Sequence, residues 1–101
     1  MAKVQVTLVK DVASGAMKGW KAGDKVVLVS NIDGKFYAIG DRCTHRGCSL
    51  SKGRMDGEVV TCPCHGSKFN LKSGDVVKGP AGEPEPGFPV QVEGDGIWIE
   101  M

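Results

Sequence analysis

The chain has 101 residues, which leaves room for one small domain and no second hydrophobic core. Hydrophobic residues make up 41% of it and charged residues 25%, as is ordinary for a soluble globular domain. A formal net charge of +1 argues against binding to nucleic acid or to an anionic membrane surface, so local motifs must carry the function.

Short segments with the composition of β-strands follow one another along the chain between glycine-rich turns. The period-two alternation of residues 3–9 predicts a first strand, and only residues 11–20 are expected to hold a helical turn. Further strands are predicted at residues 25–30, 36–39, 58–61, 67–70 and 76–78. Residues 88–92 and 97–100 are expected to form a terminal hairpin. The pattern predicts an all-β fold, a small antiparallel β-sandwich or barrel.

No apolar run approaches the roughly 20 residues of a membrane-spanning helix. The opening segment alternates apolar and polar residues, as is typical of a strand. It lacks the apolar h-region and small-residue cleavage site of a signal peptide. We therefore expect a soluble, cytoplasmic protein with no membrane partner, unless a leader has been removed from the sequence. The Gly- and Pro-rich residues 79–87 are expected to form an ordered surface loop.

All four cysteines and both histidines fall in two short segments. Residues 43–48 read C-T-H-R-G-C, and residues 62–67 read C-P-C-H-G-S. Such a concentration favours a shared metal site over isolated structural thiols or two plain disulfides with incidental histidines.

Two kinds of metal centre suit these residues. The candidate ligands, which would suit a tetrahedral zinc ion or a two-iron cluster, are Cys43, His45, Cys62 and His65. Zinc would leave Cys48 and Cys64 without a role, although they occupy corresponding places in the two segments. Ligand type alone does not decide between the metals.

The pattern Cys-x-His followed by Cys-x-x-His resembles the motif of the Rieske family, whose members bind a 2Fe–2S cluster through two cysteines and two histidines. The longer match resembles the disulfide-bearing branch, which includes the Rieske subunits of quinol-oxidising complexes. Residues 79–81 resemble the proline loop that shields the cluster. The resemblance implies a single Rieske domain over residues 1–101, with a cluster-binding subdomain inserted at roughly residues 41–80.

The resemblance also implies a role for each cysteine and histidine. One 2Fe–2S cluster would have Cys43 and Cys62 on its inner iron and His45 and His65 on its outer iron. Cys48 and Cys64 would form a disulfide between the two loops, which is unusual for a cytoplasmic protein.

Three nearby residues are expected to tune the reduction potential. Ser67 stands where high-potential relatives donate a hydroxyl hydrogen bond to a cluster sulfide; the alternative is a simple turn residue. Phe69 stands where those relatives carry a tyrosine, so one donor is missing, and Pro80 lies in the shielding loop. We expect a potential below that of the quinol-oxidising relatives. It should exceed that of four-cysteine clusters, because neutral imidazoles replace two thiolates.

Arg46 stands where quinol-oxidising relatives place leucine. A guanidinium suits a polar protein partner better than an apolar quinone pocket, although a solvated surface arginine is the alternative. His45 and His65, which the family exposes, would share the contact with a partner.

We expect a monomeric one-electron carrier that passes electrons between a reductase and an oxygenase or another oxidoreductase. One alternative is a small electron-transfer subunit of a larger complex, of the arsenite-oxidase or nitrite-reductase kind. Another is a structural zinc module for protein interaction. The sequence offers no substrate pocket and no catalytic residue apart from the candidate ligands, so the isolated chain is not expected to be an enzyme.

Overall fold

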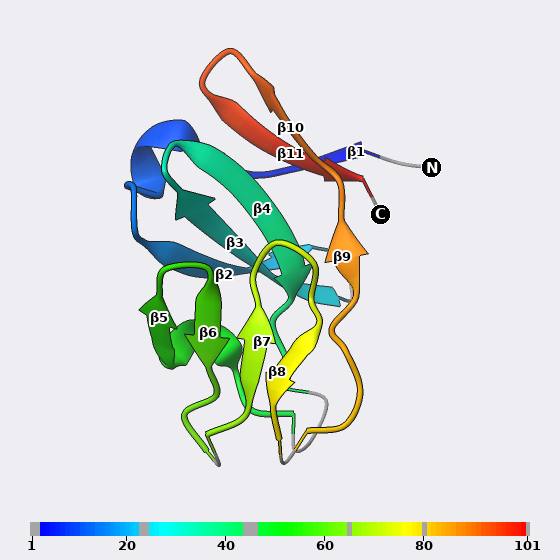
Figure 1. Cartoon of the computed structure of the whole chain (residues 1–101). Helices are drawn as coiled ribbons and strands as arrows, with labels where there is room; N and C mark the ends of the chain where they lie inside the picture. The colour runs from blue at the N-terminus through cyan, green and yellow to red at the C-terminus, as the bar shows by residue number, and fades with distance from the viewer. Residues whose placement is uncertain (1–2, 23–24, 44–46, 65, 80, 101) are drawn as a thin grey trace.

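The computed structural model describes residues 3–22, 25–43, 47–64, 66–79 and 81–100. These residues form three antiparallel sheets and two short 3-10 helices, Val9–Asp11 (η1) and Leu50–Lys52 (η2) (Figure 1). The first sheet has the order β1 (Lys3–Leu8), β11 (Gly96–Glu100), β10 (Val90–Glu93). The second has the order β2 (Met17–Ala22), β3 (Lys25–Ile32), β4 (Lys35–Gly40), β9 (Gly87–Phe88). The third has the order β5 (Arg54–Asp56), β6 (Val59–Thr61), β7 (Lys68–Asn70), β8 (Val76–Lys78).

The second sheet is the middle layer, and its central strand β3 is buried on both faces. Alternate residues of a strand point to opposite faces, and β3 uses this to contribute to two hydrophobic cores. Val27 and Val29 pack in a core with residues of β11 from the first sheet. Leu28 packs in the other core with Val60 and Phe69 of the third sheet. The third sheet is therefore held on the middle layer by its own core.

The all-β class is confirmed, but the helical turn predicted at residues 11–20 is wrong. The helical turn precedes this segment, at Val9–Asp11, and Met17–Ala22 is strand β2. Gly19 lies in β2 where helix η2 crosses it, and a Cβ there would collide with the side chain of Ser51. Glycine here permits close packing of two elements rather than limiting a helix.

The terminal hairpin is confirmed, but the strand predicted at residues 88–92 is two strands. Gly87–Phe88 pairs with β4 of the middle sheet, whereas Val90–Glu93 pairs with β11 of the first. Pro89 separates them, because proline has no N–H to donate to a ladder. Strand Arg54–Asp56 was not predicted, since none of its three residues is β-branched or aromatic.

The connection at residues 79–87 is the ordered surface loop that the sequence predicts, exposed at most described positions and anchored at two buried ones. Ala81 and Glu85 are buried, and the N–H of Glu85 donates a 2.8 Å hydrogen bond to the carbonyl of Gly74. Pro80 lies outside the described residues. The connection therefore packs against the third sheet on its way to β9 (Figure 1).

The third sheet spans residues 54–78, within the range expected for a cluster-binding subdomain, residues 41–80. The first Cys loop (residues 43–48) precedes this sheet, and the second Cys loop (residues 62–67) joins β6 to β7. Both lie at the end of the molecule opposite the β10–β11 hairpin (Figure 1). Within the residues described, no helix is both long and apolar enough to cross a bilayer.

Candidate metal centre

The two Cys loops share one backbone geometry. In the first, the N–H of Cys43 donates to the carbonyl of Cys48 at 2.8 Å. In the second, the N–H of Cys62 donates to the carbonyl of Ser67 at 2.7 Å. The residues flanking the loops pair in the antiparallel sense: Arg42 with Ser49, and Thr61 with Lys68. Each loop therefore opens on a cysteine at the same place in a hairpin.

A glycine turns each loop back toward its first cysteine. Gly47 and Gly66 adopt φ of 73° and 78°. This is the left-handed region of backbone conformation, which residues other than glycine enter at a cost of roughly 1–2 kcal/mol. Their N–H groups donate to the carbonyls of Cys43 at 2.7 Å and of Cys62 at 3.2 Å. The glycines thus fix where the two cysteines lie relative to the described second half of each loop.

The four cysteines divide into a bonded pair and a free pair. Cys48 and Cys64 form a disulfide with a Cα–Cα distance of 6.4 Å, which confirms the predicted bond between the loops. Cys43 and Cys62 are free thiols, with only 3% and 2% of their surfaces exposed. The sulfur atoms of Cys48, Cys62 and Cys64 lie within 4.8 Å of one another, but the disulfide leaves only Cys62 of these three as a thiolate donor.

The donor set fits the thiolate half of a Rieske centre. Cys43 and Cys62 occupy equivalent positions in matched loops and belong to the hydrophobic core under the third sheet. Burial among apolar side chains keeps water from the sulfur atoms. Three further predicted site residues lie outside the described part of the chain: His45, Arg46 and His65.

A buried carboxylate that the sequence analysis missed supports the first Cys loop. Asp41 is 2% exposed and accepts hydrogen bonds from the Ser49 hydroxyl and from the Ser51 N–H, the latter at 2.8 Å. The carbonyl of Asp41 also accepts the N–H of Leu50 at 2.6 Å. The only signal in the sequence is an acid just before Cys43 and two serines after the loop, which is too common to single out.

Both described residues that are expected to tune the potential are fully buried. Ser67 is not a simple turn residue, because its hydroxyl oxygen accepts the N–H of Ala81, which links the second Cys loop to the residue 79–87 connection. Phe69 packs in the core that contains Cys43 and Cys62. These positions suit a role beside the free cysteines.

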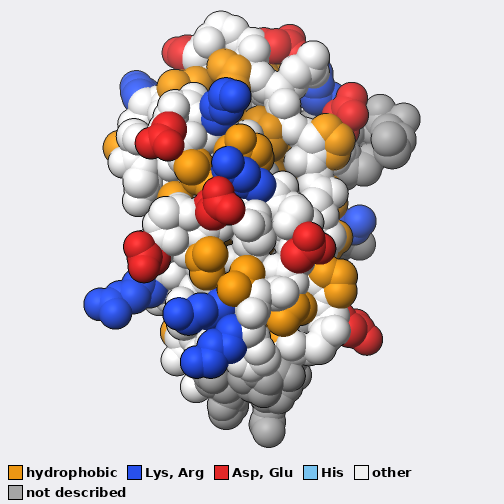
Figure 2. Space-filling view, in the orientation of Figure 1, with side chains coloured by type: hydrophobic (Ala, Val, Ile, Leu, Met, Phe, Trp, Pro, Cys, Tyr) orange, Lys and Arg blue, Asp and Glu red, His pale blue; other side chains and the backbone are white. Residues whose placement is uncertain are grey.

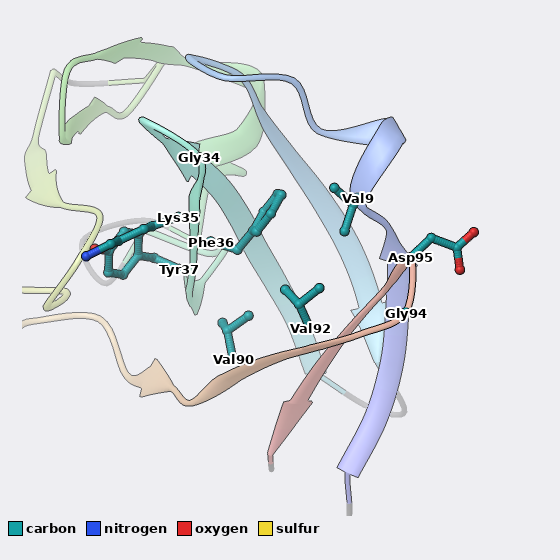
Figure 3. A pocket seen from close by; sticks show the side chains of 9 residues that line it. All are labelled: Val9, Gly34, Lys35, Phe36, Tyr37, Val90, Val92, Gly94 and Asp95. Atoms are coloured by element: carbon teal, nitrogen blue, oxygen red, sulfur yellow. The ribbon is translucent and has the colours of Figure 1, made fainter.

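A separate hollow of about 690 Å³ lies between β4 and β10 (Figure 3). Phe36, Tyr37, Val90 and Val92 contribute to its lining, and the side chain of Asp95 points away from it (Figure 3). Among the described residues no cysteine lines it, and it lies near the β3–β4 turn, at the end of β4 away from the first Cys loop.

Comparison with known proteins decides the identity of the centre. The sequence profile of the Rieske [2Fe-2S] domain matches residues 2–92. The chain belongs to the Rieske family. It binds a 2Fe–2S cluster, as the motif resemblance implied, and the zinc alternative is set aside.

Relatives of this Rieske chain are ferredoxins. It is 43% identical over 77 residues to the 3-phenylpropionate/cinnamic acid dioxygenase ferredoxin subunit of Escherichia coli strain K12, covering 75% of this chain and 73% of that protein. The Sphingomonas yanoikuyae B1 ferredoxin is 27% identical, with a TM-score of 0.93 over 99% of both chains. A chain in a complex of reduced oxygenase and oxidised ferredoxin in carbazole 1,9a-dioxygenase is 32% identical, with a TM-score of 0.89 over 96% of this chain and 91% of that one. The Rieske chain is thus an electron carrier of the ferredoxin type.

Proposed function

We propose that this Rieske ferredoxin takes single electrons from a reductase and delivers them to the terminal oxygenase of an aromatic-ring dioxygenase system. The observation that carries the proposal is the pair of matched Cys loops, each opening on a free buried cysteine, in a chain related to a dioxygenase ferredoxin subunit. Because this chain covers 99% and 91% of two ferredoxins that are chains of their own, the likeness favours a diffusible carrier over a small subunit of a larger complex. We expect it to act as a monomer in the cytoplasm.

We assign four ligands to the cluster: Cys43 and Cys62 on one iron, His45 and His65 on the other. The free state and burial of the two cysteines support the thiolate half. The imidazole half is supported by composition, since the chain has only two histidines and each lies in a Cys loop. When bound, the cluster supplies a one-electron redox couple.

The chain's own residues hold this site together and set its surroundings. The Cys48–Cys64 disulfide ties the two loops to each other. Asp41 ties the first loop to helix η2, and the Ser67–Ala81 bond ties the second to the residue 79–87 connection. These three links hold the two loops in place. A rigidly held site reorganises little when its charge changes by one electron, and a small reorganisation favours fast electron transfer.

Partner contact is assigned to the loop tips, where Arg46 lies in sequence beside His45, and His65 occupies the second loop. The guanidinium would offer charged hydrogen bonds to a protein surface, and Pro80 would flank the site in the neighbouring connection. Pathway and partners can be tested by crosslinking a tagged copy of the protein in its own host, followed by mass spectrometry. We expect an oxygenase subunit and a flavin-containing reductase. Recovery of a molybdenum enzyme or a cytochrome complex in their place would overturn the proposal and favour the subunit alternative.

A further inference from the structure

The register of the third sheet places three cationic residues in one row across its strands, with Thr61 between the first two. Arg54 pairs with Thr61, Thr61 with Lys68, and Lys68 with Lys78. Residues directly opposite one another across strands project from the same face of a sheet. Phe69, the next residue along β7, is fully buried, so the row faces away from the core. We call Arg54, Lys68 and Lys78 the basic row.

The basic row lies at the end of the sheet that bears the cluster site. Thr61 immediately precedes the second Cys loop and Lys68 immediately follows it, while Lys78 ends β8 just before the residue 79–87 connection. The space-filling view shows Lys and Arg side chains gathered just above the lower tip of the molecule (Figure 2). A partner that contacts the row is therefore brought against the Cys loops.

The sheet offers the basic row no counter-charge. In the described part of the chain no member of the row forms an ion pair. The carboxylates of the sheet and its turns lie at the opposite end, at Asp56, Glu58 and Asp75, and Glu58 is paired with Lys72 at 3.3 Å. Like charges directly opposite in a sheet destabilise it, and the two lysines of the row are such partners. The fold thus bears a repulsion that an acidic partner would relieve.

An exposed apolar side chain completes the surface. Val77 is 54% exposed, and Val92 is the other large hydrophobic residue exposed among those described. The pairing of β7 with β8 skips Val77, which lies in an irregularity of the ladder next to Lys78. Bulges of this kind re-aim a side chain on an edge strand. Apolar contact flanked by charge is typical of a docking surface.

We propose that the basic row and Val77 form a docking patch for an acidic surface, namely the carboxylates that surround the electron-transfer site of a redox partner protein. The inference rests on the proposed electron-carrier function and adds the chemistry of the partner. Opposite charges steer association and hold the encounter complex, and salt screens both effects. The net charge of +1 does not reveal this uneven charge distribution, because the basic row lies at one end of the sheet's strands and the carboxylates at the other.

Oxidation of the reduced protein by small inorganic oxidants in a stopped-flow instrument tests the local charge. The rate with ferricyanide, an anion, should fall as ionic strength rises, and the rate with the tris(phenanthroline)cobalt(III) cation should rise. The K68Q/K78Q variant should react several-fold more slowly with ferricyanide at low ionic strength and lose most of this salt dependence. The K10Q/K35Q variant makes the same change in net charge on η1 and at the start of β4, away from the Cys loops, and should behave as wild type (Figure 1).

Docking itself is tested by lysine acetylation, read by mass spectrometry, with and without poly-L-glutamate. Lys68 and Lys78 should be protected at low salt and Lys10 and Lys35 should not. Equal protection of all four lysines, or equal salt dependence of the two double variants, would overturn the docking patch. Failure of the reduced protein to pass electrons to either oxidant would instead contradict the proposed function, so the two failures are distinguishable.

Discussion

The backbone N–H of Ala81 donates a 3.0 Å hydrogen bond to the hydroxyl oxygen of Ser67, and both residues are buried. A serine hydroxyl has one proton to donate as well as lone pairs to accept with. Among the described residues no group accepts that proton, and we expect it to be donated toward the site between the Cys loops. The hydrogen bond therefore orients the Ser67 hydroxyl group and uses one of its lone pairs, not its proton.

Replacing Ser67 with alanine should lower the reduction potential, because the donor that stabilises the electron-rich reduced state is lost. A hydrogen bond to a charged group contributes about 1.5–3 kcal/mol. Since 59 mV corresponds to about 1.4 kcal/mol for one electron, we expect a drop of several tens of millivolts or more, measured by voltammetry. Ser30→Ala removes another fully buried hydroxyl, one without a hydrogen-bond partner, and is the matched control. A potential equal to that of wild type in Ser67→Ala would remove Ser67 from the tuning residues.

Phe69→Tyr should raise the potential, because it restores the hydroxyl donor that high-potential relatives carry at this position. The ring is fully buried in the core that also contains Cys43 and Cys62. The same voltammetry should show a rise of several tens of millivolts, on the same conversion as for Ser67. Phe36→Tyr adds the same hydroxyl beside the hollow between β4 and β10 and should leave the potential unchanged. A lower potential in Phe69→Tyr would show that the tyrosine analogy does not hold for this chain.

Most strands could be predicted because their signal is local. Alternation at residues 3–9 and the β-branched run at residues 25–30 correspond to β1 and β3. The errors arose where contacts between residues distant in sequence determine the structure. Gly19 is required by the approach of Ser51, which is distant in sequence, and Pro89 divides a run whose two halves join different sheets.

Removal of the disulfide in C48S/C64S should destabilise the protein by roughly 3 kcal/mol, because the bond closes a loop with a sequence separation of 16 in the unfolded chain. The urea midpoint, followed by far-UV circular dichroism, should fall, and the visible absorption of the cluster should be lost sooner on warming. Wild-type protein treated with a strong thiol reductant is the control and should approach the same midpoint. An unchanged midpoint in the double variant would contradict a stabilising role. Persistence of the cluster spectrum at low temperature is expected, because neither cysteine is assigned as a ligand.

The candidate site was predictable only as far as its chemistry is written in short motifs. The spacing of cysteines and histidines indicated the cluster and the disulfide through resemblance to a family. Asp41 could not be found in this way, since its role depends on backbone N–H groups brought to it by helix η2. The basic row could not be found either, because Arg54 and Lys78 join Lys68 in one row only through strand pairing.

The central claim is that the cluster is bound by two histidines as well as two cysteines. Electron–nuclear double resonance of the reduced protein, grown with ¹⁵N-histidine, tests it directly. Because the chain contains only two histidines, any strongly coupled histidine nitrogen belongs to His45 or His65. We predict two such couplings in wild type and the loss of the cluster in His45→Ala and in His65→Ala. The absence of histidine ¹⁵N coupling in a protein that retains two irons and two sulfides would contradict the account.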